Sequence, residues 1–279
     1  MKIGVVGVGT MGSGIAQVFA QAGYSCTLVD LSHERAIKGK ERIAAACTRL
    51  VQKGRMTADQ QEEILNNIQP GELNDLQSCS LVIEAIQEDM LTKKALFKSL
   101  VQICPPDTLF ASNTSALSLT ELSADLDRPV IGMHFFNPAP VMQLVEIVSG
   151  LGVSSSTIET LMQLVRDIGK TPIQVNEAPG FVVNRILIPM INEAITVLFE
   201  GTATAEAIDS AMKLGANHPI GPLSLADLIG NDVVLAIMNV LYEETGDSKY
   251  RPCPLLKQMV RARLLGRKTG RGFFDYENK

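Results

Sequence analysis

The first part of the chain shows a strand–helix–strand pattern of apolar residues. Residues 2–6 (KIGVV) form a short apolar run without helical period, which is typical of a strand buried on both faces. Residues 11–22 then space apolar side chains at helical intervals, and Gly23 supplies a helix stop. A second apolar run over residues 26–29 predicts another strand, which ends in Asp30.

A glycine-rich loop, GVGTMG, joins the first strand to the helix. In this spacing the first glycine allows a tight turn, the second lets the backbone approach a pyrophosphate, and the third lets the helix pack closely on the sheet. The helix N-terminus then attracts the anion. The candidate cofactor-binding positions of this loop are Gly7, Gly9, Thr10, Met11 and Gly12.

Asp30 indicates which dinucleotide the loop binds. An acid about 20 residues after the loop accepts hydrogen bonds from a ribose diol and repels a 2′-phosphate. No arginine follows Asp30 before Arg35, so NAD is preferred over NADP. An ordinary glycine turn with a solvated aspartate is the alternative, but the order strand, glycines, helix, strand and acid favours dinucleotide binding.

Residues 32–67 predict two helices in place of a short crossover, and Thr57 with Gln60 forms a candidate capping box. Residues 35–55 contain seven basic residues and one acid, Glu41, although the chain as a whole carries a net charge of −5. One interpretation is a solvated helix face. The other is a cradle for a phosphorylated part of the substrate.

The middle of the chain continues the strand–helix alternation. Residues 80–85 and 108–112 predict buried strands, with a helix over residues 92–104 between them, which indicates a doubly wound parallel sheet. Ligands of such sheets bind beyond the carboxyl ends of the strands. This directs attention to Glu84 and Glu88, and to the SNTS segment at residues 112–115.

Residues 130–148 read as two strands around a proline-containing turn. If the chain reverses near Pro140, His134 and Glu146 face each other, because each lies six residues from that point. A carboxylate bonded to one imidazole nitrogen fixes the tautomer and makes the other nitrogen a better base. Such a pair can take the proton of a substrate hydroxyl. A satisfied histidine inside a strand pair is the alternative, but the partner and the nearby cofactor site favour catalysis.

After residues 178–181 (APGF) the pattern becomes helical, and no strand pattern returns until GFFDY near the end. We therefore expect two domains, residues 1–180 with a Rossmann-like, mainly parallel α/β sheet, and residues 181–279 with helices alone. Asn184, near the start of the first long helix of the second domain, is a candidate for pointing an amide into the cleft between domains. A helix cap is its alternative role.

Composition excludes several classes of function. The residues are 46% apolar and 20% charged, which is ample for a packed core, and the acidic balance argues against a nucleic-acid partner. Five scattered cysteines argue against a disulfide framework or a metal site and fit a reducing compartment. Residues 3–29 are uncharged, but six glycines and several polar residues interrupt them. We therefore expect neither a signal peptide nor a membrane span, and we expect a cytoplasmic protein.

Several motifs together resemble the 3-hydroxyacyl-CoA dehydrogenase family, most closely its short bacterial members that act on 3-hydroxybutyryl-CoA. The motifs are GVGTMGSGIAQ, VIEA, SNTS, HFFNPAPVM, APGFVVNRI, GANHPIGP and GRKTGRGFFDY. The resemblance runs from end to end. It implies reversible, NAD-dependent oxidation of a (3S)-hydroxyacyl-CoA to a 3-oxoacyl-CoA by a homodimer that associates through the helical domain.

The resemblance also implies roles for particular residues. By motif position, the catalytic histidine of the family falls on His134 and its glutamate on Glu146, while the serine of SNTS and the asparagine of VNR, which contact the substrate, fall on Ser115 and Asn184. The CoA-contacting basic residue of the helical hairpin falls on Lys53, with Arg49 assisting. The implied contacts to NAD are Asp30, Glu88, Lys93, Ser115 and Asn137.

Two other functions stay open from the sequence. A dehydrogenase of free 3-hydroxyacids has the same two-domain organisation, but a free acid brings no phosphate for Lys53 to bind. A non-catalytic dinucleotide-binding or structural protein is the second alternative. The complete set of His134, Glu146, Ser115 and Asn184 argues against it.

Overall fold

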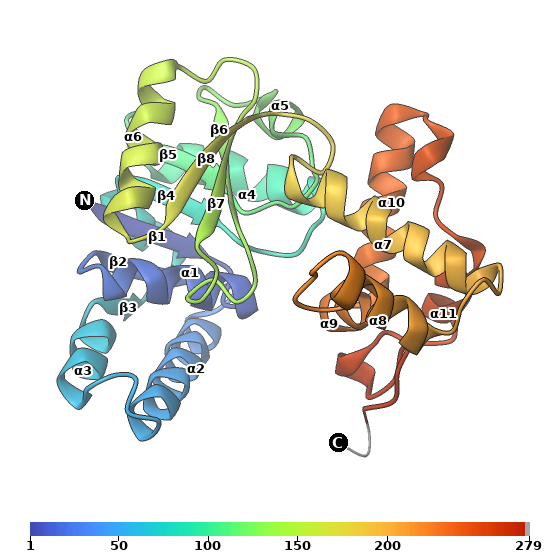
Figure 1. Ribbon diagram of the computed structural model, residues 1–279. Helices are drawn as coiled ribbons and strands as arrows, with labels where there is room; N and C mark the ends of the chain where they lie inside the picture. Colours follow the sequence, from blue (N-terminus) through green and yellow to red (C-terminus); the bar gives the residue numbers. More distant parts are fainter. Residues whose placement is uncertain (277–279) are drawn as a thin grey trace. The chain divides into compact units, whose positions relative to one another are not determined.

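An eight-stranded sheet organises the N-terminal part of the computed structural model, which describes residues 1–276 (Figure 1). The chain divides into two compact units, Met1–Glu177 and Ala178–Lys279, and the sheet belongs to the first. Its strands are β1 (Lys2–Val6), β2 (Ser25–Val29), β3 (Ile68–Pro70), β4 (Leu81–Glu84), β5 (Leu109–Ser112), β6 (Val130–Phe135), β7 (Leu144–Ser149) and β8 (Thr171–Asn176). The apolar runs that predicted β1, β2, β4 and β5 are thereby confirmed as strands.

The strand order is β3-β2-β1-β4-β5-β6-β7-β8, the doubly wound arrangement that the sequence predicts. The first six strands in this order, from β3 at the edge to β6, pair in parallel. Strand β7 runs antiparallel to β6, and β8 pairs in parallel with β7. The carboxyl ends of β1, β2, β4, β5 and β6 consequently lie along one edge of the sheet.

Helices cover both faces of this sheet (Figure 1). They are α1 (Thr10–Gln21), α2 (His33–Gln52), α3 (Ala58–Asn66), α4 (Met90–Ile103), α5 (Leu119–Ser123) and α6 (Ser155–Asp167), with a 3₁₀ turn at Leu73–Ser78. The helical hairpin expected between β2 and the next strand is α2 with α3. The Thr57–Gln60 capping box that starts α3 is present as predicted, with Gln60 Oε1 accepting from Thr57 N at 2.9 Å.

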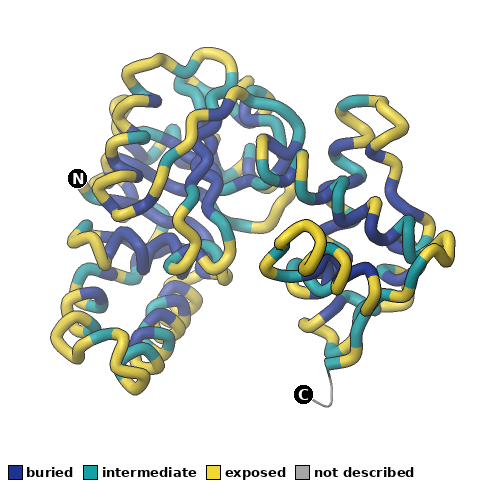
Figure 2. The backbone as a smooth tube through the Cα atoms, in the orientation of Figure 1, coloured by how far each residue is buried: buried dark blue, intermediate teal, exposed yellow. Residues whose placement is uncertain are grey.

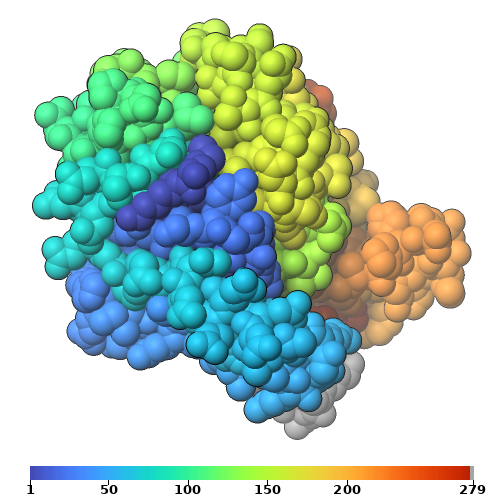
Figure 3. All heavy atoms as spheres, turned by 90° about the vertical axis from the view of Figure 1, so that its left-hand side faces the viewer, coloured from blue at the N-terminus to red at the C-terminus, as the bar shows by residue number. Residues whose placement is uncertain are grey.

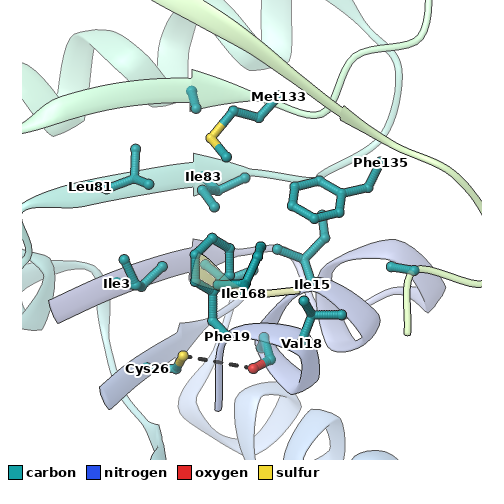
Figure 4. Packing of buried hydrophobic residues seen from close by; sticks show 14 of the residues in the cluster. Ile3, Ile15, Val18, Phe19, Cys26, Leu81, Ile83, Met133, Phe135 and Ile168 are labelled. Atoms are coloured by element: carbon teal, nitrogen blue, oxygen red, sulfur yellow. Dashed lines mark hydrogen bonds between the residues drawn. The ribbon is translucent and has the colours of Figure 1, made fainter. Parts of the chain in front are cut away.

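The main core of unit 1 lies between the sheet and helices α1 and α6. Ile15 and Phe19 of α1 pack against Ile3, Ile83 and Met133 of the strands (Figure 4). The residues of this layer are mostly buried, whereas the outer face of the α2–α3 hairpin is exposed (Figure 2). In the space-filling view α3 stands out from the body of the unit (Figure 3).

A buried ion pair lies beyond the carboxyl end of β4. Lys93 of α4 is 1% exposed, and its Nζ lies 2.5 Å from Oε1 of Glu84, the fully buried last residue of β4. Glu84 also accepts hydrogen bonds from the backbone N of Ile86 at 2.7 Å and from Ser112 Oγ, at the end of β5, at 2.6 Å. These partners compensate the carboxylate for the loss of water.

Unit 2 contains the helices α7 (Val183–Phe199), α8 (Ala205–Gly215), α9 (Pro222–Ile229), α10 (Asn231–Thr245) and α11 (Pro254–Arg261), with 3₁₀ turns at Ser248–Tyr250 and Arg267–Thr269. The all-helical character is as predicted. The GFFDY segment lies among isolated bridges, Gly266 with Arg271 and Arg271 with Asp275, and forms no regular strand within the described residues.

One buried carboxylate holds this final segment against α9. Asp227 is 1% exposed and accepts hydrogen bonds from the backbone N atoms of Phe273 (3.0 Å) and Phe274 (2.9 Å), and from Tyr276 Oη (3.1 Å). Burial and the neighbouring Asp227 raise the pKa of the Tyr276 phenol to about 12. Tyr276 therefore stays a neutral hydrogen-bond donor at physiological pH.

In residues 1–276 no single helix is long and apolar enough to cross a membrane. The sharply bent pair α9 and α10 meets the test only when the two helices are taken together.

All five cysteines are buried thiols. Burial raises the pKa of Cys26 to about 12 and that of Cys104 to about 11, in both cases with a contribution from the neighbouring Cys79. The thiolate is the nucleophile, so we expect slow alkylation by iodoacetamide in the native protein at about pH 8. In concentrated guanidinium chloride all five should react at the rate of a free thiol. Rapid labelling of any cysteine under native conditions, detected by mass spectrometry, would contradict this assignment.

The ion pair of Glu84 and Lys93 predicts a large loss of stability when one partner is removed. Lys93→Met leaves a buried carboxylate without its cation, which we expect to lower the free energy of unfolding by about 3 kcal/mol in urea denaturation. Combining it with Glu84→Gln should cost less than the sum of the two single changes. The control is Lys98→Met on the same helix, where an exposed lysine pairs with Asp125; its effect should stay within about 0.5 kcal/mol.

Candidate active site at the carboxyl edge of the sheet

The glycine loop has the geometry that a dinucleotide requires. Gly7 adopts a φ of +103°, and a Cβ there would lie 2.5 Å from the carbonyl oxygen of Ala85. A Cβ on Gly12 would lie 1.8 Å from the carbonyl oxygen of Gly7, so only glycine allows α1 to start this close to β1. Gly9, in contrast, has no atom within 4 Å of its Cβ position. The loop is therefore closed on the protein side and open at Gly9, as the pyrophosphate of NAD requires.

Asp30 lies at the end of β2 beside this loop. Its Oδ2 accepts from the backbone N of Val8 at 2.9 Å, and its Oδ1 accepts from the backbone N of Leu31 at 2.8 Å. Arg35, in the first turn of α2, places Nε 3.0 Å from Oδ1. The expectation that Arg35 lies too far along the chain to affect Asp30 is wrong, because the first turn of the helix directs its side chain back to the strand end.

His134 and Glu146 face each other as the hairpin prediction requires. They are directly paired across β6 and β7, and His134 Nδ1 lies 2.8 Å from Glu146 Oε2. Both side chains are buried, with 5% and 1% of their surface exposed. The ring of Phe136 lies 4.5 Å from the imidazole, centroid to centroid. The carboxylate of Glu146 therefore holds the imidazole through Nδ1, which orients the ring.

Glu88 holds the segment that carries Ser115. Its Oε1 accepts from the backbone N of Ser115 at 2.7 Å and from Thr114 Oγ1 at 2.6 Å. Lys93 lies between the two glutamates, because its Nζ also approaches Oε2 of Glu88 to 3.3 Å. The ends of β4 and β5 are thus joined through charged groups, and the position of the Ser115 backbone depends on that connection.

A second hydrogen bond joins this segment to the histidine strand. Asn113 Oδ1 accepts from the backbone N of Phe135 at 2.8 Å, one residue after His134. The SNTS motif predicts a site at this strand end but no role for Asn113 or Thr114. Their function as connectors depends on side-chain direction, which the motif alone does not reveal.

The structure brings most predicted site residues to this edge and places others elsewhere. The residues at or next to the carboxyl ends of the strands are Gly7, Gly9, Thr10, Met11, Gly12, Asp30, Glu88, Lys93, Ser115, His134, Asn137 and Glu146. Lys93 is buried against Glu84 and Glu88, and Asn137 is exposed in the loop after β6.

Three predicted residues lie away from this edge or in the other unit. Arg49 and Lys53 are exposed at the end of α2 opposite to Arg35, and Arg49 Nε donates to the carbonyl of Ala45 at 3.2 Å. Asn184 is a buried residue near the start of α7, in unit 2.

Two family models match the chain. The model of the 3-hydroxyacyl-CoA dehydrogenase NAD binding domain matches residues 2–178, and that of the 3-hydroxyacyl-CoA dehydrogenase C-terminal domain matches residues 180–276. The first match contains the glycine loop, Asp30 and the His134–Glu146 pair.

Individual relatives are similar over their whole length. The chain is 53% identical to the 3-hydroxybutyryl-CoA dehydrogenase of Clostridioides difficile, covering 99% of each protein. It is 48% identical to the 3-hydroxybutyryl-CoA dehydrogenase of Bradyrhizobium diazoefficiens, covering 99% of this chain and 95% of the relative. Its fold matches the crystal structure of (S)-3-hydroxybutyryl-CoA dehydrogenase from Ralstonia eutropha with a TM-score of 0.95, at 48% identity and 99% coverage of both chains. The chain therefore belongs to the 3-hydroxyacyl-CoA dehydrogenase family of NAD-dependent oxidoreductases.

Proposed function

We propose that the protein catalyses the reversible oxidation of (3S)-3-hydroxybutyryl-CoA to acetoacetyl-CoA, with NAD as the cofactor. The observation that carries this proposal is the buried contact between His134 and Glu146 on the strand edge that also bears the glycine loop. The names of the similar proteins support the choice of a short-chain acyl-CoA.

His134 is the proposed acid–base residue. In the oxidative direction its Nε2 takes the proton of the C3 hydroxyl, and in the reductive direction it returns a proton to the developing alkoxide. Glu146 holds the ring through Nδ1 and stabilises the imidazolium that forms. NAD, when bound, accepts the hydride from C3. Gly7, Gly9, Thr10, Met11, Gly12, Asp30, Glu88, Lys93, Ser115 and Asn137 are the residues proposed to hold it.

Ser115 and Asn184 are proposed to hold the oxygen atoms of the substrate. Both are neutral hydrogen-bond donors, and such donors contribute about 3 kcal/mol each when they are placed against a developing oxyanion. Glu88 and Thr114 fix the backbone of Ser115. Lys93 is buried against Glu88, so its proposed effect on the cofactor acts through that glutamate.

Arg49 and Lys53 are proposed to bind the phosphate groups of CoA. They belong to the basic run of α2, which also contains an arginine and a lysine already bound to protein acids, Arg35 to Asp30 and Lys38 to Glu34. Lys53 is exposed at the carboxyl end of the helix. The CoA thioester brings a 3′-phosphate and a pyrophosphate, which require cations of this kind.

A homodimer formed through unit 2 and a cytoplasmic location complete the proposal. Unit 2 exposes several large apolar side chains, namely Val182, Ile186, Phe199, Leu214 and Leu228. Exposed apolar side chains are more frequent on surfaces that a second copy covers than on the rest of a soluble protein. The five cysteines are free thiols, which fits a reducing compartment. The proposal includes no membrane or nucleic-acid partner.

The function is tested by adding acetoacetyl-CoA to the protein and NADH and measuring the decrease in NADH absorbance. We expect turnover by the parent protein, and we expect His134→Gln to lower kcat by about 100-fold or more, because glutamine cannot transfer the proton. Glu146→Gln should also lower kcat, by about tenfold or more, because the amide holds the ring without a compensating charge.

Binding of NADH, followed by its fluorescence, is the control for both variants and should stay intact. Turnover near that of the parent protein in either variant, together with normal NADH binding, would show that the pair does not carry the proton.

Lys53→Ala separates a CoA-ester dehydrogenase from a dehydrogenase of free acids. The change should raise KM for acetoacetyl-CoA about tenfold, because a charge-assisted contact to phosphate is lost. It should have little effect on KM for the pantetheine thioester, which lacks the 3′-phosphate. Lys98→Ala removes an exposed positive charge from α4 and is the matched control. An equal rise in KM for both thioesters would contradict the role of Lys53.

A further inference from the structure

Two arginines of α2 lie beside the glycine loop: Arg35 contacts Asp30, and Arg42 contacts the loop itself. Arg35 places Nε 3.0 Å from Asp30 Oδ1, and its side chain is 57% exposed, whereas that of Asp30 is 12% exposed. The guanidinium is therefore open to solvent on the side away from Asp30. It can rotate without leaving a buried group unpaired.

Arg42 approaches the same loop from two helical turns farther along α2. Its Nη1 donates to the carbonyl oxygen of Val8 at 2.7 Å, and Ser13 Oγ donates to the same oxygen at 3.0 Å. Asp30 accepts from the backbone N of Val8. A single loop residue is thus held through its N–H by the acid and through its carbonyl by Arg42.

Close packing fixes α2 in this position. A Cβ on Gly39 would lie 2.7 Å from the Cβ of Val8, so only a glycine lets the helix lie directly on the loop. Both arginines therefore belong to a helix whose distance from the cofactor loop cannot vary much.

These contacts combine an acid that is typical of NAD-binding proteins with an arginine that is typical of NADP-binding proteins. An acid at the end of the second strand binds the ribose 2′-hydroxyl of NAD, whereas a nearby arginine accommodates the 2′-phosphate of NADP. Here the acid and the arginine are bonded to each other.

We propose that Arg35 is a latent binding site for a 2′-phosphate, which the charge of Asp30 blocks in the parent protein. The proposal deepens the proposed function and rests on it, because it concerns the cofactor of that same site.

The charges around Asp30 explain why binding of NADP is suppressed. A ribose 2′-phosphate carries nearly two negative charges. In the parent protein Arg35 is paired with Asp30, and Lys38 is paired with Glu34 at 2.6 Å. Loss of the carboxylate charge would release Arg35 for the paired hydrogen bonds that a guanidinium makes with phosphate.

Asp30→Asn tests the proposal because it removes the charge and keeps an oxygen that can accept from Val8 N. Fluorescence titrations should give a Kd for NADPH at least tenfold lower than that of the parent protein, and a Kd for NADH about tenfold higher. Thermal unfolding monitors whether the variant keeps its fold.

Arg35→Ala in the Asp30→Asn background identifies the phosphate-binding group. It should reverse the gain for NADPH by at least tenfold and change the Kd for NADH by less than threefold. Lys38→Ala in the same background is the matched control, since it removes one positive charge from the next turn of the same helix. It should change the Kd for NADPH by less than threefold.

Two results would overturn the inference. They are an unchanged Kd for NADPH in Asp30→Asn, or an equal effect of Arg35→Ala and Lys38→Ala in that background. If Asp30→Asn does not fold, Asp30→Ser removes the same charge and takes its place in both comparisons. Failure of the parent protein to bind NADH would overturn the proposed function as well, whereas normal NADH binding with no gain for NADPH overturns this inference alone.

Discussion

The antiparallel return of β7 along β6 is the constraint on which the site depends. Parallel neighbours need a long crossover connection between them. Only an antiparallel return lets two residues that are close in the sequence face each other across adjacent strands. The register of β6 and β7 sets His134 against Glu146. A shift by one residue would send the carboxylate to the other face of the sheet. Because both side chains are buried, such a shift would also leave a charge and an imidazole without partners, so the fold and the site favour the same register.

The polar groups behind the pair form a continuous support. Glu84, Lys93 and Glu88 join β4 to α4, and Thr114 and Asn113 continue the connection to the backbone beside His134. Buried charges of this kind do not by themselves make a protein more stable than apolar residues would. Their contribution is to fix direction, because a lysine between two glutamates has few alternative positions.

Much of this architecture could be predicted from the sequence, because the signals are local. Short apolar runs predicted β1, β2, β4 and β5, and equal spacing around the turn at Pro140 predicted the pairing of His134 with Glu146. Strands β3 and β8 are not predicted by the pattern of apolar residues. Strand β3 has only three residues, and β8 is an edge strand whose alternate positions are mostly exposed, so neither has a strong apolar pattern.

Side-chain contacts that depend on how the helices pack on the sheet could not be predicted. Sequence distance suggested that Arg35 has no effect on Asp30, yet one turn of helix brings the two side chains into contact. The burial of Lys93 could not be predicted from the sequence. It follows from the burial of Glu84 at the end of β4, because a buried carboxylate needs a charged partner. Such contacts depend on the packing of helices on the sheet, which periodicity does not specify.

The attachment of residues 273–276 to Asp227 has a consequence for how the protein is made. Until those residues are synthesised, Asp227 lacks three of its hydrogen-bond donors, so its burial beside α9 has an uncompensated desolvation penalty. Unit 1 has all of its strands once Asn176 has left the ribosome, so it can fold while translation continues. The helical unit, in contrast, can complete its packing only after residues 273–276 have left the ribosome, because Phe273 and Phe274 pack against its core.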